Sequence, residues 1–489
     1  MSLHKFCERK NPVMNLNKRI TFILNNETIS AEVAPNLVAL DYLRQNRSLT
    51  GSKEGCKEGD CGACSVILGE HVGDDLRYKA VTSCLLPMGE LHGKHLVSIE
   101  GINLDDLSPI QSAMVDCGGT QCGYCTPGFI VAMTAGLMDE SIPLDDSGVD
   151  YAISGNLCRC TGYRSIKTAG RTAIKELKSF IVDRPRIDAL CESGVLPIYF
   201  RDIPSRLSAI PPVQIDSNFK APFIAGGTDL FVQKGEELPK QRASLLNMTP
   251  VNPICNENSY VFIDARESFE SFGRNPIIKK YIPSINDYND AIASWPIRER
   301  ATLGGNICNA SPIADMTTLL LAMNSEILIS GPDSEHWLPL SKFYLGYKML
   351  AKRPEERVLS IRFPEPEKGT FINWEKVSKR RVLDIATVNS AAMLRQENGL
   401  IASATLTLGG VAATPLVLSD TSKKLIGLPL TVEAIKPVID SAQSEFDPIS
   451  DVRGDETYKR LLARQLLWVH FQMMMHEKID EGAFDEALR

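Results

Sequence analysis

The stretch Gly51-Ser-Lys-Glu-Gly-Cys56-Lys-Glu-Gly-Asp-Cys61-Gly-Ala-Cys64 places three cysteines and four glycines within fourteen residues of a 489-residue chain. A fourth cysteine, Cys84, follows after nineteen further residues. Four thiolates at such spacing suit a metal centre, because a thiolate is a strong ligand for zinc and for iron. Glycines keep bulky side chains away, so that backbone N–H groups can approach the sulfur atoms. The predicted ligands are Cys56, Cys61, Cys64 and Cys84.

The spacing of these four cysteines favours an iron–sulfur cluster over a zinc ion. C-x4-C-x2-C followed by a distant fourth cysteine is the spacing of plant-type ferredoxins, which hold a [2Fe–2S] cluster. A structural zinc loop is the alternative, but zinc sites in small domains usually pair two short hooks of the C-x2-C type. We therefore expect the first cysteine group to bind a [2Fe–2S] cluster.

A second cysteine group lies in two later segments, Gln121-Cys-Gly-Tyr-Cys-Thr-Pro-Gly128 and Gly155-Asn-Leu-Cys-Arg-Cys-Thr-Gly-Tyr-Arg164. Two cysteine hooks could hold one zinc ion, although C-x-C is awkward for a tetrahedral mononuclear site. Two iron atoms could each take part of the set, so spacing alone leaves both metals open. The predicted ligands are Cys122, Cys125, Cys158 and Cys160, whereas Cys7, Cys117, Cys191, Cys255 and Cys308 are expected to be ordinary thiols.

The pattern of apolar residues places the first cysteine group in a small α+β unit and the second in a helical unit. Asn25-Asn26 is the expected turn between the first two strands. Five prolines between residues 183 and 220 favour an extended linker. The predicted strands are 18–24, 27–33, 65–68, 80–83, 370–377 and 402–408, and the predicted helices lie within 36–46, 109–138 (broken at 117–128), 150–180 and 456–475.

Composition excludes several classes of protein. The chain has 53 Lys and Arg against 60 Asp and Glu, a net charge of −7, whereas a nucleic-acid-binding protein usually presents a basic face. No segment approaches the roughly 20 consecutive apolar residues of a membrane span, and the N-terminal sequence lacks an apolar signal core. The chain has thirteen cysteines, and we expect them in a reducing compartment. We therefore expect a cytoplasmic protein that binds no nucleic acid and has no membrane span.

The two cysteine blocks, in this order, resemble the iron–sulfur region of the molybdenum hydroxylases, the family of xanthine dehydrogenase, aldehyde oxidase and carbon monoxide dehydrogenase. The resemblance is carried by Glu54-Gly-Cys, by Asp60-Cys-Gly-Ala-Cys64 and by the two segments of the second cysteine group. It implies that the second group also binds a [2Fe–2S] cluster. It further implies that Gln121 reaches the pterin of a partner subunit.

Two glycine motifs farther along the chain resemble the FAD loops of the same family. In Pro222-Phe-Ile-Ala-Gly-Gly-Thr-Asp-Leu230, a strand leads into two glycines that let backbone N–H groups approach a pyrophosphate. Alone, this motif could be an ordinary turn. Ala301-Thr-Leu-Gly-Gly-Asn-Ile-Cys-Asn-Ala-Ser-Pro-Ile-Ala-Asp315 resembles the second FAD loop along its whole length. The FAD contacts implied by the resemblance are Ile224, Ala225, Gly226, Gly227, Thr228, Asp229, Leu230, Thr302, Gly305, Asn306, Ser311, Asp315, Val358 and Lys376.

The resemblance covers roughly residues 17–475 and implies a multidomain α+β fold. The expected order is a β-grasp plant-type ferredoxin domain (17–101), an all-α four-helix [2Fe–2S] domain (102–182), a linker (183–215), a PCMH-type FAD-binding domain of two α/β subdomains (216–366), and a C-terminal α+β domain as in the carbon monoxide dehydrogenase flavoprotein (367–489).

The resemblance also implies a function. We expect the small subunit of a split xanthine dehydrogenase, because no residues remain for the molybdopterin-binding portion, which would lie on a large partner subunit in an α2β2 heterotetramer. Electrons would pass from the partner through both clusters to FAD and on to NAD⁺, as hypoxanthine and xanthine are converted to urate. No catalytic residue for hydroxylation is expected in this chain.

Two departures from the family pattern concern the flavin. Arg380-Arg-Val-Leu-Asp-Ile-Ala386 stands where NAD⁺-using members carry an acidic run, so oxygen, a quinone or a ferredoxin are alternative acceptors. Ile292 stands where the family often stacks a phenylalanine on the flavin. Three other functions stay open: another split molybdenum hydroxylase for aldehydes, an N-heterocycle or carbon monoxide; an electron-transfer module without turnover; and a zinc-stapled interaction protein.

Overall fold

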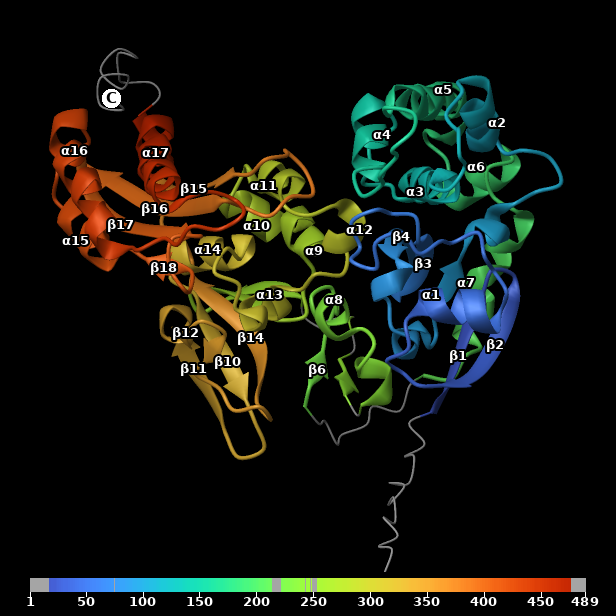
Figure 1. Cartoon of the computed structure of the whole chain (residues 1–489), viewed down its shortest axis with the longest axis horizontal. Coiled ribbons are helices and arrows are strands. Elements are labelled where there is room, and N and C mark those ends of the chain that lie inside the picture. Colours follow the sequence, from blue (N-terminus) through green and yellow to red (C-terminus); the bar gives the residue numbers. More distant parts are fainter. Residues whose placement is uncertain are drawn as a thin grey trace, which may run out of the picture.

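The computed structural model describes residues 17–73, 75–212, 221–241, 243–246, 248 and 253–475. Figure 1 shows the helical unit above the first α+β unit on one side, the C-terminal unit on the opposite side, and the flavin unit between them. Cys7, the predicted junction between linker and FAD domain at 215–216, and residues 476–489 of the predicted C-terminal domain lie outside the described residues. None of the described helices is long and apolar enough to cross a bilayer.

The first unit is a five-stranded β-grasp sheet with the order β2-β1-β5-β3-β4. Alternation in β1 buries Ile20, Phe22 and Leu24 on the core side. All four predicted strands of this unit are confirmed, although the third and fourth are longer than the sequence indicated. The elements are β1 (Lys18–Leu24), β2 (Glu27–Val33), α1 (Ala39–Asp41) continuing as η1 (Tyr42–Asn46), β3 (Ser65–Val72), β4 (Asp75–Thr82), η2 (Ser83–Leu85), η3 (Met88–Leu91), β5 (His95–Val97) and η4 (Ile99–Ile102).

The second unit is all-α, as predicted. Ser108 caps α2 in a capping box: its hydroxyl accepts from the Gln111 N–H, and the Gln111 side-chain oxygen accepts from the Ser108 N–H. Every residue from Gly128 to Met138 in α3 is buried, because this helix lies between the β3–β4 sheet and the other helices. The helices are α2 (Pro109–Asp116), α3 (Thr126–Met138), α4 (Asp146–Ala152) and α5 (Arg164–Ile181).

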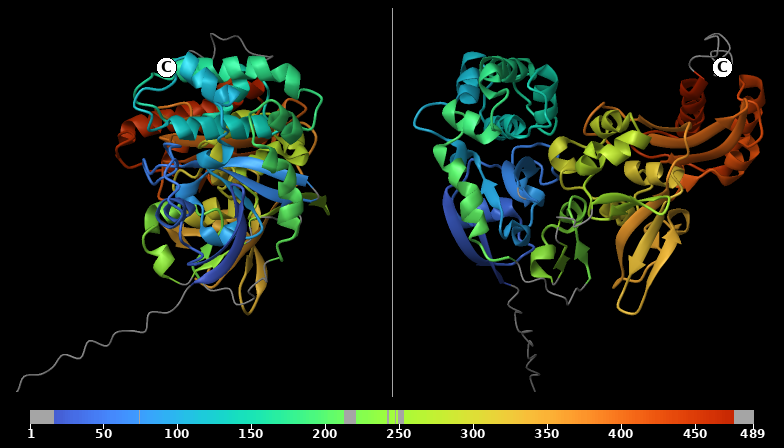
Figure 2. Two further views of the ribbon diagram at one scale, coloured as in Figure 1. Left: turned by 90° about the vertical axis from the view of Figure 1, so that its right-hand side faces the viewer. Right: turned by 180° about the vertical axis from the view of Figure 1, so that it is seen from behind.

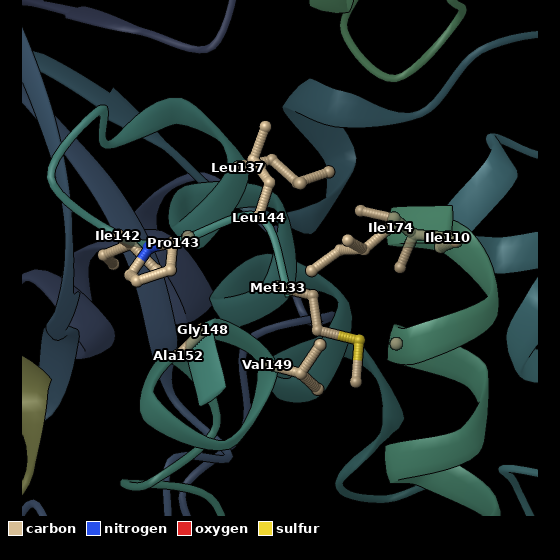
Figure 3. A pocket seen from close by; sticks show the side chains of 13 residues that line it. Ile110, Met133, Leu137, Ile142, Pro143, Leu144, Gly148, Val149, Ala152 and Ile174 are labelled. Atoms are coloured by element: carbon tan, nitrogen blue, oxygen red, sulfur yellow. The ribbon is translucent and has the colours of Figure 1, made fainter. Parts of the chain in front are cut away.

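A small cavity lies among these four helices. Apolar side chains and glycines line it, and Figure 3 shows Met133, Val149 and Ile174 among them. Such a lining offers no hydrogen-bonding group to a polar ligand, so we treat the cavity as part of the helical core.

The segment predicted as an extended linker is largely helical over its described residues. Pro185 and Pro197 stand at N-caps and Pro204 in a first turn. The prolines therefore begin helices, where a missing N–H costs nothing, and do not break them. The three helices are α6 (Arg186–Glu192), η5 (Ile198–Asp202) and α7 (Ile203–Ser208).

The flavin unit has two parts. A small parallel pair, β6 and β7, packs with α8, and a five-stranded antiparallel sheet has the order β11-β10-β14-β9-β8. The elements are β6 (Phe223–Ile224), α8 (Leu230–Lys234), η6 (Leu238–Lys240), β7 (Ser244–Leu245), β8 (Ile254–Glu257), β9 (Tyr260–Asp264), α9 (Phe269–Arg274), α10 (Pro276–Tyr281), α11 (Ile285–Ala291), α12 (Trp295–Arg298), α13 (Leu303–Asn309), α14 (Asp315–Ala322), β10 (Glu326–Ser330), β11 (Glu335–Pro339), η7 (Leu340–Lys342), β12 (Tyr344–Gly346), β13 (Met349–Leu350) and β14 (Arg357–Pro364).

The C-terminal unit is a four-stranded sheet, β15-β16-β17-β18, packed against helices. Its first strand and last helix have the predicted bounds, and the strand predicted at 402–408 lies within β17. Figure 2 shows this unit at the far end of the molecule from the helical unit. The elements are β15 (Thr370–Val377), β16 (Val388–Glu397), β17 (Leu400–Gly409), β18 (Leu416–Val417), α15 (Ser419–Leu425), α16 (Val432–Ser441), η8 (Ala442–Glu445) and α17 (Glu456–Met475).

Candidate iron–sulfur and flavin sites

The first four predicted thiols come together as two hydrogen-bonded pairs, Cys56 with Cys61 and Cys64 with Cys84. Three of them lie on the loop before β3, and Cys84 lies in η2, which follows β4. The hydrogen bond with Cys61 lowers the pKa of Cys56 to about 5, and the Glu58 N–H adds a donor 3.4 Å from the Cys56 sulfur. The same hydrogen bond raises the pKa of Cys61. In the second pair the Cys64–Cys84 hydrogen bond lowers the pKa of Cys64 and raises that of Cys84, so one sulfur of each pair is favoured as thiolate, the form that ligates a metal.

Glycine is required at two points of this loop. A methyl group on Gly55 would lie 2.7 Å from the Cys61 sulfur. Gly62 has φ of +63°, and a methyl group there would lie 2.4 Å from the Asn156 side chain of the helical unit. The loop can approach the sulfurs and the neighbouring unit only because these side chains are missing.

The second four thiols form two further pairs. Cys122 and Cys160 have their sulfur atoms 3.6 Å apart on the surface, and the thiol of Cys125, the N-cap residue of α3, forms a hydrogen bond with that of Cys158. Burial disfavours the Cys158 thiolate, but hydrogen bonds from the Thr161 hydroxyl and N–H outweigh burial and lower the pKa of Cys158.

The donor sets fit two-iron clusters. In a four-cysteine [2Fe–2S] cluster each iron takes two thiolates, and both cysteine groups supply two pairs. Backbone N–H groups point at the sulfurs, as such clusters require. Within the described part of the chain the ligand cysteines stand in pairs, and no three or more His, Cys, Asp or Glu side chains converge on a position for one metal ion.

The two cysteine loops contact each other through their backbones. The Leu157 N–H, next to Cys158, donates to the Cys61 carbonyl at 2.9 Å, and the Asn156 side chain donates to the Gly62 carbonyl at 3.1 Å. Within the second cysteine group the Gln121 amide donates to the Cys160 carbonyl at 3.2 Å, and the nearby Tyr124 hydroxyl donates to the Glu54 carbonyl of the first cysteine loop at 2.5 Å. Gln121 is exposed beside the outer thiol pair, where the sequence predicted a contact with a partner.

The first glycine motif follows β6 and packs against the first cysteine group. Cys64 and Cys84 share one apolar cluster with Ile224 and with Phe231 of α8. The Ile224 side chain is fully buried in this cluster, so only its backbone could reach a ligand. Gly227 has φ of +74°, which turns the chain from the strand toward α8. The residues Ala225, Thr228, Asp229 and Leu230 surround this turn and are partly exposed.

The second glycine motif forms α13 and the loop after it. The Thr302 hydroxyl caps α13 by accepting from the Gly305 N–H at 3.0 Å. Gly304 donates to the Ala265 carbonyl, and Ala265 donates to the carbonyl of Leu359, the residue after Val358. The predicted contact Val358 therefore lies beside this motif, although its side chain is buried in the core of the unit.

Three polar side chains meet at the start of α14. Asp315 accepts from Lys376 at 2.8 Å and from Asn389 at 2.6 Å, and Lys376 also donates to the Ala291 carbonyl at 2.9 Å. Asn306 accepts from the Thr317 N–H and hydroxyl at 3.2 and 2.9 Å. The predicted Ser311 accepts from the Ile313 N–H at 3.4 Å, within the loop between Asn306 and Asp315.

Asn389 was not predicted from the sequence. It stands 74 residues after Asp315, within β16, where a polar residue facing inward gives no local signal. The one available clue is that this asparagine stands in the first half of the strand, where the other residues are apolar or small.

The two glycine motifs fit a dinucleotide. They meet through Gly226, where an added methyl group would lie 1.6 Å from the Arg300 carbonyl oxygen. Glycines of this kind leave backbone N–H groups accessible to a pyrophosphate.

Four family descriptions match the chain in sequence order. Residues 22–89 match the 2Fe-2S iron-sulfur cluster binding domain, 98–171 the [2Fe-2S] binding domain, 213–366 the FAD binding domain in molybdopterin dehydrogenase, and 375–474 the CO dehydrogenase flavoprotein C-terminal domain. These matches confirm the predicted fold class and the predicted cofactors of the chain, two [2Fe–2S] clusters and FAD.

Relatives of known function are longer than this chain. Xanthine dehydrogenase of Emericella nidulans is 27% identical over 91% of this chain and 38% of its own length. Aldehyde oxidase 4 of Cavia porcellus is 27% identical over 83% of this chain and 35% of its own length. The chain thus spans well under half of these relatives.

Among solved structures, carbon monoxide dehydrogenase from Hydrogenophaga pseudoflava superposes with a TM-score of 0.48 and 28% identity, covering 53% of this chain and 92% of that one. The four domain matches in family order decide the classification: this chain belongs to the molybdenum hydroxylases and carries their iron–sulfur and FAD-binding domains.

Proposed function

We propose that this chain is the electron-transfer subunit of a cytoplasmic, xanthine dehydrogenase-type molybdenum hydroxylase of purine catabolism. A molybdopterin-containing large subunit would deliver electrons to the cluster on Cys122, Cys125, Cys158 and Cys160. They would continue through the cluster on Cys56, Cys61, Cys64 and Cys84 to FAD, and from FAD to NAD⁺. When bound, the clusters carry single electrons and FAD accepts them singly and releases a pair, so that they can leave as a hydride.

One observation carries the proposal: the candidate sites form a sequence from the surface to the flavin motif. The outer thiols Cys122 and Cys160 are exposed, whereas Cys64 and Cys84 are buried in the same apolar cluster as Ile224 of the first glycine motif. The backbone hydrogen bond from Leu157 to Cys61 joins the two cysteine groups. This order supports transfer from an external donor toward FAD.

The surface around the outer thiols supports docking of a partner subunit. Tyr124 and Leu157 directly precede the ligand cysteines Cys125 and Cys158, and they expose 47% and 42% of their surface. Exposed apolar side chains gathered beside a redox site are typical of a protein interface. Gln121 lies within this surface and is proposed to contact the partner's pterin.

The residues proposed to hold FAD are those of the two glycine motifs and the polar group at α14. The backbone of Gly226, Gly227 and Thr228 would bind the pyrophosphate, and Asp315 is held in one orientation by Lys376 and Asn389. A fixed carboxylate can accept hydrogen bonds from a nucleotide without reorganising. Asn306 and Ser311 would complete this side of the site.

The substrate of the whole complex is proposed from relatives alone. An aldehyde oxidase is as similar to this chain as the xanthine dehydrogenases are, at 27% identity. A split aldehyde-oxidising molybdenum hydroxylase is therefore the second candidate, and it would use the same electron path in this chain.

The test is cofactor analysis of the purified full chain, followed by assay of its complex. We expect about four iron atoms and about one FAD per chain, and electron paramagnetic resonance of the reduced protein should show two distinct [2Fe–2S] signals. NADH–dye reduction by the chain would support NAD⁺ as the acceptor. Co-purification with a molybdopterin subunit and xanthine-dependent NAD⁺ reduction would complete the assignment; zinc in place of iron, with no flavin, would overturn it.

A further inference from the structure

A chain of buried ion pairs runs through the contact between the two cysteine units and the flavin unit. It begins with Arg300, which directly precedes the second glycine motif and contacts the first. It passes through the β-grasp sheet to Asp139 of the helical unit and returns to the flavin unit at Arg298. Its links alternate in charge, and several side chains are almost completely buried. In order they are Arg300–Glu90 (2.9 Å), Glu90–Lys94 (3.5 Å), Lys94–Glu70 (2.6 Å), Glu70–Lys79, Lys79–Glu299 (4.0 Å), Glu299–Arg77 (2.7 Å), Arg77–Asp139 (3.5 Å), Asp139–Arg274 (2.8 Å), Arg274–Glu270 (2.8 Å) and Glu270–Arg298 (2.8 Å).

Within this network of ion pairs, Arg300 contacts the first glycine motif of the proposed flavin site. Its side chain is 1% exposed, and one guanidinium nitrogen donates to the Gly226 carbonyl at 2.7 Å. The guanidinium also binds both carboxylate oxygens of Glu90, at 3.0 and 2.9 Å. Its backbone carbonyl occupies the space where Gly226 would otherwise carry a side chain. Arg300 therefore holds the Gly226 backbone from two sides.

Glu90 connects this contact to the unit that holds the first cysteine group. It lies on η3, a few residues after Cys84, and its neighbour Gly89 packs against Leu245 of β7. Burial alone would raise the pKa of Glu90, but the charges of Arg300 and Lys94 lower it below its ordinary value. The carboxylate is therefore ionised and bound to Arg300 at neutral pH.

We propose that Arg300 is a positioning residue that fixes the first FAD loop relative to the unit bearing Cys64 and Cys84. This inference rests on the proposed FAD site. A guanidinium is planar and can serve two acceptors in a fixed geometry, whereas an ammonium is a point donor. Gly226 and Glu90 belong to different units. The Arg300 guanidinium binds both residues, and it therefore fixes the distance between the glycine loop and the first cysteine group.

The test compares FAD binding by the full chain carrying Arg300→Lys or Arg300→Met with that of the wild type, measured by flavin fluorescence titration. We expect both substitutions to weaken FAD binding at least about tenfold, the size of one lost hydrogen bond to a charged group. The lysine variant should not restore affinity, because its charge is kept but the fork is lost. The near-ultraviolet circular dichroism of bound flavin should change as well.

Arg274→Lys is the control. Arg274 makes ion pairs with Asp139 and Glu270 across the same contact between units, but neither partner belongs to a glycine motif. It should lower the melting temperature and leave FAD affinity and the flavin spectrum unchanged. FAD affinity of the Arg300 variants equal to that of Arg274→Lys, or full rescue by lysine, would overturn the positioning role.

If the Arg300 variants do not fold, Glu90→Gln decides the question. Glutamine keeps one hydrogen bond to Arg300 but not the paired geometry, so FAD affinity must fall; unchanged affinity and an unchanged flavin spectrum would overturn the proposal. A wild-type chain that binds no FAD would instead refute the proposed flavin site, so the two failures are distinguishable.

Discussion

The eight candidate ligand thiols differ in burial, and the exposed pair belongs to the group proposed to receive electrons first. Cys64, Cys84 and Cys158 are buried, Cys56, Cys61 and Cys125 are half-buried, and Cys122 and Cys160 are exposed. Each cysteine group has its own backbone N–H donor to a sulfur atom, Glu58 to Cys56 in the first group and Thr161 to Cys158 in the second. The two groups can therefore be tested separately by substitution.

Replacing one thiol in each group tests this separation. We expect Cys84→Ser to abolish one [2Fe–2S] signal and Cys160→Ser to abolish the other, each with the loss of about two iron atoms, because a two-iron cluster needs four thiolates. Iron analysis and electron paramagnetic resonance provide the measurement. Cys117→Ser, a half-buried thiol of the helical unit, is the matched control and should keep both signals. A loss of iron in the control equal to that in Cys84→Ser would contradict the assignment.

A single methyl group at Gly226 should also prevent FAD binding. The added carbon would lie 1.6 Å from the Arg300 carbonyl oxygen, so one of the two glycine motifs must move. We expect Gly226→Ala to lose FAD while keeping its iron, as measured by flavin absorbance after gel filtration. Gly346→Ala is the control, because a methyl group there meets only the Met349 sulfur at 3.7 Å. Retention of FAD by Gly226→Ala would argue against the proposed FAD site at the two glycine motifs.

At the scale of elements, α12 joins three units although it is a single turn. Its Trp295 is completely buried in the core of the helical unit, and its backbone N–H donates to Ser154 at 3.3 Å. Ile297 lies against the first cysteine loop, where a methyl group on Gly59 would come within 2.5 Å of its side chain. The helix thus contacts both cysteine groups from the flavin unit, and Figure 1 shows it at that boundary.

Trp295→Ala should therefore weaken the contact between units. Removing a fully buried tryptophan costs about 3–5 kcal/mol, because the lost apolar contacts and the remaining cavity both add to the cost. We expect a lower melting temperature in differential scanning calorimetry and faster proteolysis between the units. Leu345→Ala, at a side chain 65% exposed, is the control and should change stability by less than about 0.5 kcal/mol. Equal melting temperatures for the two variants would disprove the role of α12.

At the scale of the whole molecule, neighbouring units share parts of their cores, and buried polar groups make stability depend on pH. His470 of α17 is buried with Asn373 donating to Nδ1 at 2.9 Å and Nε2 facing the Ser390 hydroxyl at 2.9 Å. Burial lowers the pKa of His470 to about 3. The folded protein keeps this imidazole neutral, whereas the unfolded chain takes up a proton below a pH of about 6.5.

Acidification should therefore destabilise the fold. For a histidine with a lowered folded-state pKa, stability is full above the unfolded pKa and is lost as the pH falls below it. From pH 7.5 to 5.5, His470 should contribute a loss of about 1.4 kcal/mol in the free energy of unfolding. Urea unfolding followed by tryptophan fluorescence measures this loss. His470→Gln should be less stable at pH 7.5 and show a smaller pH dependence; an unchanged pH dependence would contradict the prediction.

Local patterns were sufficient for much of the fold. The strand at 370–377 and the helix at 456–475 have the predicted bounds, because alternation and helical periodicity are properties of neighbouring residues. The linker was predicted to be extended but is largely helical over its described residues. Composition did not reveal this, because prolines occur both at helix N-termini and in extended segments. The two cysteine groups were predictable from their spacing, which the chemistry of a metal centre restricts, whereas the order of the four domains was inferred from the family resemblance of the motifs.

The sequence by itself determined which thiols and glycines belong together, since cysteine spacing and glycine placement are read along the chain. Only the tertiary structure showed that Asn389 meets Asp315, that Arg300 binds Gly226 and Glu90, and that the first cysteine group shares a core with Ile224. Arg300 and Glu90 are 210 residues apart, and a buried ion pair at that separation leaves no periodic signal. The packing of units decides such contacts, because charges so far apart along the chain become neighbours only after the units have met.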